Sequence, residues 1–423
     1  MPASPCSPAT GAARRPWPPP EPSTRMIPYG RQTITADDIA AVTAVLRSDF
    51  LTQGPAVEAF ERKFAERVGA RHAVAVNNAT AALHLALRVA GVGPGDRVVT
   101  SPITFVASAN AAAYVGATPD FADIDPVSHT LSPAALAAGW RADTRAVVSV
   151  DYAGQAADLP AIAAYARARG AVVIDDACHA VGGSFHSGGR PWSLGGNPWA
   201  DLTTFSFHPV KTLTTGEGGM LVTDRDDWAA LARTLRSHGI VRNTNNFTPA
   251  SDGCPLLAER GPWFYEMQEL GHNYRITDMQ CALGLSQLGR LDACLRRRRE
   301  IVAAYNAAFA GLPWLQTPAL RDPADAATTS WHLYTVQIDF AALGKTRTEA
   351  MAALRDAGVG SQVLYIPVHL QPWYRRNYGY AQGKCPAAEA FYTRTLSLPL
   401  FPAMTDADVD RVVVAVRNLF SPS

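Results

Sequence analysis

The sequence predicts an α/β protein built around a mostly parallel sheet with helices on both faces. Short apolar segments of strand character alternate along the chain with segments of helical spacing. One of them, Gly170 to Asp176, reads GAVVIDD, an apolar run ending in two carboxylates that is typical of a buried parallel strand. A chain of 423 residues, 48% of them hydrophobic, can bury one large core or two.

The first half of the chain supplies most of the expected sheet. A helix is expected from Thr35, which can act as the N-cap, with Asp37 and Asp38 placed where carboxylates suit the helix dipole. The stretch SDFLTQGP ends this helix. The elements that follow are expected as helices at 57–68, within 77–92 and at 159–169, and as strands at 73–76, 96–101, 118–121, 146–150 and 170–176.

The second half of the chain begins with a segment, 224–272, that we expect to be irregular because turn-forming residues gather there. A helix is expected from Asn273 through Leu288, and a long helix follows Gly289 to about Phe309. The remaining elements form a second domain, with strands near 331–340 and 361–365 and helices at 348–357, 387–395 and 406–419.

The domain boundaries follow from this pattern. Residues 1–25 are rich in Pro, Ala and Ser and lack the apolar core of a secretory signal, so we expect a disordered extension. Met26 could be the true start, and an intact Pro2 peptide in the native protein would contradict that hypothesis. We expect a large domain at 26–288 and a small C-terminal domain at 289–423.

One lysine stands in a short loop between two apolar, β-rich segments. Lys211 lies between 202–207 and 220–222, and Gly216, Gly218 and Gly219 follow it. Glycines let a ligand approach the backbone closely. On this loop alone, a solvated lysine in a hairpin remains an open interpretation.

The strand that ends at Asp176 places an acid where α/β proteins bind ligands. A lysine and an acid together suit pyridoxal 5′-phosphate (PLP): the lysine forms a Schiff base, and the acid keeps the pyridine nitrogen protonated. The small residues Ala79 and Thr80 open a helix whose N-terminus could bind the cofactor phosphate. An ordinary capped helix with Thr80 near the cap is the alternative.

Several unrelated motifs then occur in one order. SFHPVK with the following TTGEGG, IDDACHAVG at 174–182 and NYRITDMQCALG at 273–284 resemble the DegT/DnrJ/EryC1/StrS family of sugar aminotransferases, over roughly 27–420. Within the family, SDFLTQG, SVDYAG and FSFHPVK point to the branch that makes UDP-4-amino-4,6-dideoxy-N-acetyl-β-L-altrosamine, a pseudaminic acid precursor.

The resemblance implies a PLP-dependent transferase of fold type I, similar to aspartate aminotransferase, with a mixed, mostly parallel sheet in a large domain and a smaller C-terminal α+β domain. It implies Lys211 and Asp176 as catalytic residues, with Asp175 pointing away because strand neighbours face opposite sides. The implied cofactor-binding residues are Ala79, Thr80, Phe105, Asp176, His179, Ser206, Lys211 and, from the neighbouring subunit of a homodimer, Asn273. The implied substrate-binding residues are Tyr29, Asp49, Phe50, Leu51, Thr52, Trp331, His332, Leu333 and Tyr334.

Several roles stay open at this point. Phe105 could be a core residue, His179 could serve the strand-to-helix turn, and Asn273 could be an N-cap within its own chain. The expected reaction moves the amino group of L-glutamate to a UDP-linked 4-keto sugar. Alternatives are a dTDP- or GDP-linked sugar or a cyclitol, and a regulatory family member without catalysis. The family's dehydratase branch is disfavoured because Lys211 is present, and a nicotinamide enzyme because no GxGxxG opens a helix after a strand.

The charge and the cysteine content bear on the cellular location of the protein and on its binding partners. A net charge of +1 and a pI near 7.7 favour neither nucleic acid nor a membrane surface. The run 296–299 is expected to be the solvated face of a helix. No apolar run approaches the roughly 20 residues that span a bilayer. The six scattered cysteines are expected to be free thiols in the cytoplasm, and no metal site is expected.

Overall fold

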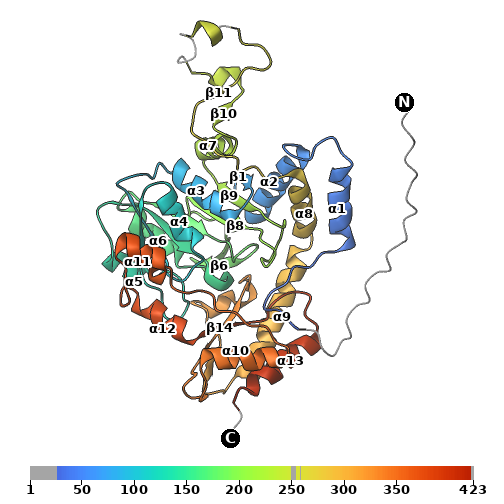
Figure 1. Ribbon diagram of the computed structural model, residues 1–423, viewed down its shortest axis with the longest axis vertical. Helices are drawn as coiled ribbons and strands as arrows, with labels where there is room; N and C mark the ends of the chain where they lie inside the picture. The colour runs from blue at the N-terminus through green and yellow to red at the C-terminus, as the bar shows by residue number, and fades with distance from the viewer. Residues whose placement is uncertain (1–25, 249–253, 258, 421–423) are drawn as a thin grey trace, which may run out of the picture.

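The computed structural model describes residues 26–248, 254–257 and 259–420, and a seven-stranded sheet lies at its centre (Figure 1). The strand order is β1-β9-β8-β5-β4-β2-β3, in which β9 runs antiparallel to both neighbours and the other adjacent pairs are parallel. The expected mixed, mostly parallel sheet is therefore confirmed. The strands are β1 (His72–Val76), β2 (Arg97–Thr100), β3 (Thr118–Phe121), β4 (Thr144–Val150), β5 (Val172–Asp176), β8 (Leu202–Ser206) and β9 (Gly219–Thr223).

Helices cover both faces of this sheet. In β1, Ala73 and Ala75 join the hydrophobic cluster that contains Phe60 and Phe64, whereas the alternate residues of the strand join a second cluster with the third helix. Because successive strand residues face opposite sides, one strand contributes to two cores. The helices of this part are α1 (Ala36–Leu46), α2 (Pro55–Val68), α3 (Ala79–Val89), α4 (Ala107–Tyr114), α5 (Pro133–Ala138), α6 (Leu159–Arg167), α7 (Asp226–Arg236) and α8 (Asp278–Leu288). A two-stranded sheet, β6 (Ser184–Ser187) with β7 (Arg190–Ser193), follows β5 in the chain.

The N-cap expected at Thr35 is confirmed. Thr35 and Asp38 form a capping box at the start of α1. Asp38 is 1% exposed and pairs with Arg290 at 2.6 Å. Burial alone would raise the pKa of Asp38, but hydrogen bonds and the charge of Arg290 lower it to about 2. The ion pair between Asp38 and Arg290 connects α1 to the segment that follows α8.

Three predicted elements differ from the structure. The segment 224–272 is not irregular throughout, because it contains α7, whose acidic first turn and basic last turn are marks of a helix that the turn-forming residues further along the segment outweighed. The helix expected from Asn273 begins at Asp278, because Thr277 and Gln280 form its capping box. The strand expected at 361–365 is absent, since only a single bridge joins that segment to β14.

The chain between α7 and α8 forms an arm that projects from the rest of the molecule, at the top of Figure 1. Its paired strands are β10 (Ile240–Val241) and β11 (Glu266–Met267). Large apolar side chains on this arm are exposed, among them Trp263 and Leu270, at 61% and 72%. The arm therefore offers apolar surface that the rest of its own chain leaves uncovered.

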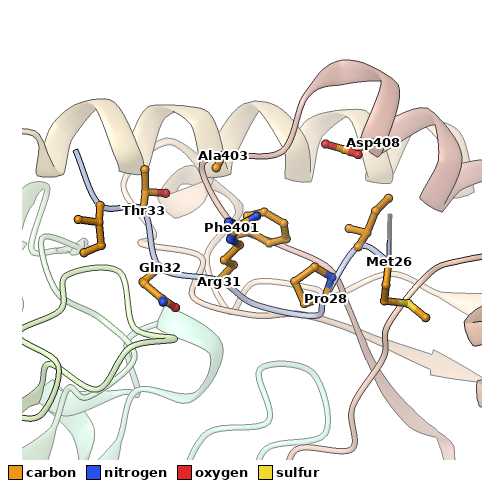
Figure 2. Close-up of a pocket in the computed structure, with 10 residues that line it drawn as sticks. Met26, Pro28, Arg31, Gln32, Thr33, Phe401, Ala403 and Asp408 are labelled. Atoms are coloured by element: carbon orange, nitrogen blue, oxygen red, sulfur yellow. The ribbon is translucent and has the colours of Figure 1, made fainter. Parts of the chain in front are cut away.

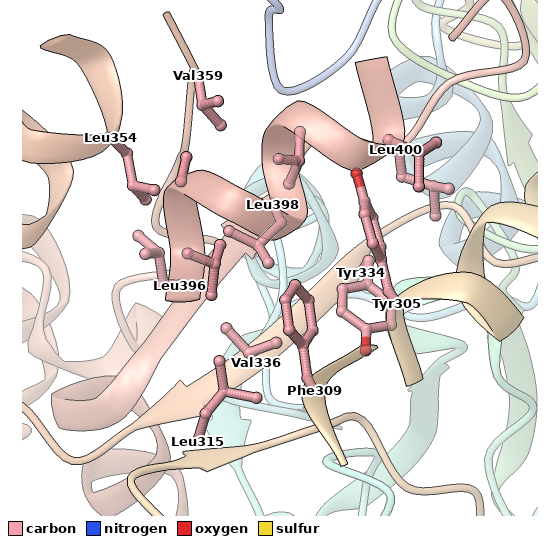
Figure 3. Packing of buried hydrophobic residues seen from close by; sticks show 14 of the residues in the cluster. Tyr305, Phe309, Leu315, Tyr334, Val336, Leu354, Val359, Leu396, Leu398 and Leu400 are labelled. Carbon is pink, nitrogen blue, oxygen red and sulfur yellow. The ribbon is translucent and has the colours of Figure 1, made fainter. Parts of the chain in front are cut away.

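The C-terminal part has its own hydrophobic core, shown in Figure 3. Tyr305 and Phe309 of α9 pack against Tyr334 and Val336 of one strand, β13, and against the next strand along the chain, β14. Its sheet has the order β12-β13-β14 and is antiparallel. Its elements are α9 (Leu291–Phe309), β12 (Leu315–Gln316), β13 (Tyr334–Ile338), α10 (Arg347–Asp356), α11 (Pro372–Tyr378), α12 (Pro386–Arg394), β14 (Thr395–Leu398) and α13 (Asp406–Arg417).

Packing crosses the expected boundary between 26–288 and 289–423 in several places, and Leu291 and Leu295 of α9 belong to the cluster that contains Phe60. Ile27 lies in the C-terminal core and forms a bridge with Val359. A separate cluster joins Phe121 to residues of α11 and α12. The division at residue 289 stays a prediction, and the expected extension at 1–25 lies outside the described residues.

The run 296–299 is only partly the solvated helix face that its charge pattern suggested. Arg298 is 1% exposed, and its Nη1 donates to the carbonyl oxygens of Trp331, His332 and Leu400 at 3.2, 3.1 and 3.0 Å. Burial lowers the pKa of Arg298 to about 10. Arg296 is exposed as expected, but the prediction was wrong for Arg298, because a run of like charges does not show which buried carbonyl groups need a donor.

Within the described ranges, none of the helices combines the length and the apolar character needed to cross a membrane. No group of three or more His, Cys, Asp or Glu side chains in the same ranges could hold a metal ion. The five cysteines that the structure describes are free thiols.

Candidate active site

A cavity of about 430 Å³ lies at the carboxyl ends of β4, β5 and β8, next to the N-terminus of α3. The register pairs the last residue of β4, Val150, with the last residue of β5, Asp176. Parallel strands therefore deliver their ends to one edge of the sheet. Of the residues predicted from the sequence, the cavity is lined by Tyr29, Ala79, Thr80, Phe105, Asp176, His179, Ser206 and Lys211.

The N-terminus of α3 opens into this cavity. Asn78, not Thr80, is the N-cap, and its Oδ1 accepts from the N–H of Ala81 at 2.8 Å. The N–H groups of Ala79 and Thr80 precede the first intrahelical bonds and have no acceptor among the described residues. A Cβ at Gly219 would lie 2.7 Å from the backbone nitrogen of Ala79, so only glycine permits β9 to start this close to the helix.

Asp176 faces the cavity from the end of β5. Its Oδ2 accepts from the hydroxyl of Ser108 at 2.6 Å and its Oδ1 from the N–H of Cys178 at 3.3 Å. Its neighbour Asp175 is 0% exposed and does not line the cavity. Asp175 lies instead beside the equally buried Asp151, as the alternation of a strand requires.

Lys211 enters the cavity from the loop after β8. The loop folds back on Phe207, which accepts from Thr215 N–H at 3.0 Å and from the Thr214 hydroxyl at 2.9 Å. Burial lowers the pKa of the Lys211 amine, while the charge of Asp176 and the Cys178 thiol act in the opposite direction. A lysine with a lowered pKa supplies more neutral amine, the form that attacks a carbonyl group.

The remaining predicted residues of the cavity surround this pair. Phe105 precedes α4 and is 58% exposed, so its ring is free to contact a planar ligand. Ser206 ends β8, and its Oγ accepts from His208 N–H at 3.4 Å. His179 follows β5, and burial, then the charge of Lys211, holds its pKa well below the usual value.

Other predicted residues are not brought to this cavity within one chain. Five of them are exposed, namely Asn273 and, in one loop, Asp49, Phe50, Leu51 and Thr52. Trp331, Leu333 and Tyr334 are buried in hydrophobic clusters, and His332 packs on His179 with ring centroids 4.5 Å apart. The substrate roles of 331–334 stay predictions that this geometry does not support.

The sequence reasoning missed several residues of the cavity. Ser108 carried no signal, because its contact with Asp176 joins positions 68 apart in the chain. Cys178 lies inside the family-like stretch 174–182 without a predicted role. The stretch 365–375 is also family-like, and its aromatic side chains are expected either to close over the sugar or to pack a loop, but Tyr365 is not singled out among them. Asn78 could have been found from its position before an apolar helical pattern, which is the mark of an N-cap.

The cavity fits the phosphate and the ring of PLP. Unpaired N–H groups at the start of α3 suit a phosphate, and Gly219 leaves room beside them. A carboxylate held by two donors suits a protonated ring nitrogen, and the buried amine of Lys211 suits the aldehyde. The donor set therefore agrees with the cofactor predicted from the sequence.

A second cavity, of about 250 Å³, lies between the N-terminal segment and the C-terminal part of the chain (Figure 2). Arg31 and Thr33 line it on one side, and Phe401 and Asp408 on the other. It holds neither Lys211 nor Asp176. It is therefore separate from the candidate active site.

Comparison with known proteins places this geometry in a family. The sequence model of the DegT/DnrJ/EryC1/StrS aminotransferase family matches residues 32–417. The spore coat polysaccharide biosynthesis protein SpsC of Bacillus subtilis (strain 168) is 44% identical over 394 residues, which are 93% of this chain and 97% of that protein.

Solved structures agree. PseC of Helicobacter pylori, an aminotransferase involved in the biosynthesis of pseudoaminic acid, superposes with a TM-score of 0.82 at 29% identity, over 94% of this chain and 99% of that chain. The PLP-form of Spr1654 from Streptococcus pneumoniae, a putative sugar aminotransferase, gives a TM-score of 0.81 at 28% identity, over 94% and 100%. The expected fold class and cofactor are confirmed. The chain therefore belongs to the DegT/DnrJ/EryC1/StrS aminotransferase family, a family of PLP-dependent sugar aminotransferases.

Proposed function

We propose that this chain moves the amino group of L-glutamate to C4 of a UDP-linked 4-keto-6-deoxy-N-acetylhexosamine and so makes UDP-4-amino-4,6-dideoxy-N-acetyl-β-L-altrosamine. One observation carries the chemistry: a single cavity contains Lys211, Asp176 and the unpaired N-terminus of α3. The likeness to PseC, which extends over 99% of that chain, supports a sugar of the pseudaminic acid type.

The residues of the cavity have different roles in the proposed reaction. PLP, when bound, supplies an electron sink for the negative charge that develops at the α-carbon of the amino acid. Lys211 would hold the cofactor covalently, and its freed amine would take the proton from the α-carbon and later return a proton. Asp176 would keep a proton on the ring nitrogen, because its negative charge stabilises the pyridinium form.

The other cavity residues orient the cofactor. The N–H groups of Ala79 and Thr80, together with the hydroxyl of Ser206, would hold the phosphate, where the helix dipole favours negative charge. Phe105 would pack on the face of the ring, and His179 would lie near the ring or the substrate. Tyr29 lines the side on which the nucleotide sugar binds.

The active form in this proposal is a homodimer with shared sites. Three apolar side chains on α1 and the loop after it are exposed: Ile39 at 61%, Leu46 at 57% and Phe50 at 53%. A second copy of the chain would cover this apolar surface, which supports a dimer. Asn273 is exposed and would reach the cofactor phosphate of the neighbouring subunit. The loop 49–52 would line the nucleotide-sugar pocket from the same interface. A cytoplasmic location remains part of the proposal.

A second candidate is the same chemistry on another nucleotide-linked 4-keto sugar, carried by dTDP or GDP. The identity to SpsC, 44%, exceeds the identity to PseC, 29%, and SpsC is named for spore coat polysaccharide biosynthesis. A family member without catalysis is less well supported, because Lys211 and Asp176 line the same cavity.

The test incubates the purified protein with PLP, L-glutamate and a panel of UDP-, dTDP- and GDP-linked 4-keto sugars, and identifies the products by mass spectrometry. The proposal expects amination of the UDP-linked 2-acetamido-2,6-dideoxy sugar in preference to the others. Amination of a dTDP or GDP sugar alone would favour the second candidate. Absence of any amination by a protein that binds PLP would favour the member without catalysis.

A further inference from the structure

Tyr365 reaches the active-site cavity from the segment that follows α10. Its hydroxyl lies 3.1 Å from Nε2 of His179. Its ring stacks on His179, with centroids 6.0 Å apart and planes at 24°, and lies 6.2 Å from the ring of Phe105. The side chain therefore stands beside both ring-binding residues in the cavity that contains Lys211.

The hydrogen bonds of His179 decide where its proton lies. The backbone N–H of Ala153 donates to Nδ1 of His179 at 3.2 Å, so this nitrogen carries no proton. Ala153 is held in a left-handed conformation, φ 59°, and its carbonyl oxygen accepts from His332 N–H at 2.8 Å. A neutral imidazole has one N–H, which must then be on Nε2 and must donate to Tyr365.

This arrangement leaves the hydroxyl proton of Tyr365 without an acceptor. The Tyr365 oxygen already accepts from His179, and among the described residues no group accepts from its O–H. Burial first, and then the nearby Tyr152, raises the pKa of Tyr365 well above the usual value, so the phenol stays protonated. Tyr365 is half-buried and lines the cavity, so this O–H is available to a ligand that brings an acceptor into the cavity.

We propose that Tyr365 donates a hydrogen bond to the carbonyl oxygen of the ketone substrate. The inference rests on the proposed aminotransferase function and adds a catalytic residue to it. The reacting carbon of any ketone must lie at the same place relative to Lys211, so the donor serves 2-oxoglutarate as well as the keto sugar. A fixed donor stabilises the charge that develops on this oxygen when an amine attacks the carbon. Ala153 and His179 act as positioning residues.

Binding provides a test that does not depend on turnover. The PLP-loaded protein has no amine with which a ketone can react, so 2-oxoglutarate binds without reaction. Glutarate is the same dicarboxylate without the carbonyl oxygen. Calorimetry should show that the unmodified protein prefers 2-oxoglutarate by roughly three- to tenfold, the range of one hydrogen bond. The Tyr365→Phe variant should bind both dicarboxylates equally.

Transient kinetics provides the second test. Protein in the pyridoxamine phosphate form is mixed with 2-oxoglutarate and, separately, with the keto sugar. Tyr365→Phe should slow the reaction with 2-oxoglutarate by about tenfold or more. Phenylalanine keeps the ring contacts, and an unchanged melting temperature verifies the fold. Tyr165→Phe, which removes a hydroxyl bonded to the Ala137 carbonyl at 3.3 Å away from the cavity, is the matched control and should leave the rate unchanged.

The outcomes separate the two proposals. A variant that keeps both the preference for 2-oxoglutarate and the rate would overturn the role of Tyr365. A shift in the pH titration of the cofactor absorbance, with the preference retained, would assign the hydroxyl to the cofactor and also overturn it. Failure to aminate any sugar, together with the expected loss for 2-oxoglutarate, would overturn the proposed sugar substrate and leave Tyr365 supported.

Discussion

The amine of Lys211 is the reactive group of the proposed mechanism. Burial lowers its pKa, and Asp176 lies in the same cavity. Lys211→Ala should reduce amination by at least ~10³-fold, because both the covalent hold on PLP and the proton transfer are lost. PLP should still bind through the helix N-terminus, but without the absorbance of the covalent form.

Borohydride reduction followed by peptide mapping measures the covalent bond directly. The reduced adduct should lie on Lys211 in the unmodified protein and be absent from the variant. Lys63→Ala, which removes an exposed lysine paired only with Glu66 on α2, is the control and should behave like the unmodified protein. An adduct on another lysine would contradict the assignment.

The burial of Asp151 makes the stability of the folded protein depend on pH. It is 0% exposed, and desolvation raises its pKa to about 8, with the charge of Asp176 acting in the same direction. The unfolded chain releases this proton near pH 4, whereas the folded protein keeps it until about pH 8. Between these values the folded state holds more protons, so its stability falls as pH rises, by about 1.4 kcal/mol per pH unit.

Asp151→Asn should weaken this dependence, and the neighbouring Asp175, whose pKa is raised by burial and then by Asp151, contributes the part that remains. Asparagine resembles the protonated acid and can still accept from Ala157 N–H, a bond of 2.9 Å in the unmodified protein. The stability of the variant minus that of the unmodified protein should therefore increase from pH 5 to pH 8 in denaturant titrations followed by circular dichroism. His84, whose pKa burial lowers to about 4, contributes the opposite slope below pH 6.5, but it is common to both proteins and cancels. The exposed Asp410→Asn serves as control, and a flat difference would contradict the assignment.

At the scale of elements, the α3 N-terminus depends on a glycine in another strand. A Cβ at Gly219 would lie 2.6 Å from the carbonyl carbon of Asn78, and backbone atoms cannot move aside as a side chain tip can. Gly219→Ala should therefore displace the phosphate site, weaken PLP binding and destabilise the protein by about 1–3 kcal/mol.

PLP titration of the apoprotein and thermal melting measure these two effects. Gly93→Ala is the matched control, because its added Cβ would meet only the Val115 carbonyl oxygen at 4.0 Å. Equal PLP affinity in Gly219→Ala and in the control would mean that the cofactor does not depend on the start of α3.

Elements with strong local signals were predicted well from the sequence. Strand β3 has the expected bounds, Thr118–Phe121, and β5 ends at Asp176 as expected. Helix α7 was missed although Asp226 and Asp227 suit its first turn and Arg233 and Arg236 its last, because turn-forming residues further along set the prediction for the whole segment. The start of α8 was placed five residues early because Asn273 and Thr277 are both good N-caps, and only the pairing of Thr277 with Gln280 decides between them.

The residues of the candidate site likewise fall into those that a local pattern predicts and those that depend on distant contacts. Lys211 and Asp176 were found because each lies in a loop or strand end with its own pattern. Ser108 and Ala153 were not assigned roles, and Tyr365 was only one of several aromatic residues expected over the sugar or in a loop, because their contacts arise only when distant segments meet. The arrangement of Tyr365 against His179 joins positions 186 apart in the chain, and no local pattern encodes it.

At the scale of the whole molecule, one chain leaves some predicted site residues outside its own cavity. Asn273 is exposed, although its neighbour Tyr274 accepts from Asn77 N–H at 2.9 Å beside the start of α3. The exposed apolar side chains of the arm and of α1 give a second copy a surface to cover. A shared site would explain both observations at once, and mixing variants tests it.

Asn273→Ala alone should weaken PLP binding, since it removes a donor to the phosphate. When Asn273→Ala and Lys211→Ala subunits are unfolded and refolded together, half of the dimers are mixed. In a mixed dimer, one site combines an intact Lys211 with an intact Asn273 from the other subunit, so about a quarter of the unmodified activity should return. If each chain used its own Asn273, no site in the mixture would be intact, and the activity would not exceed the average of the separately refolded variants. Size-exclusion chromatography of the mixture verifies that dimers have formed.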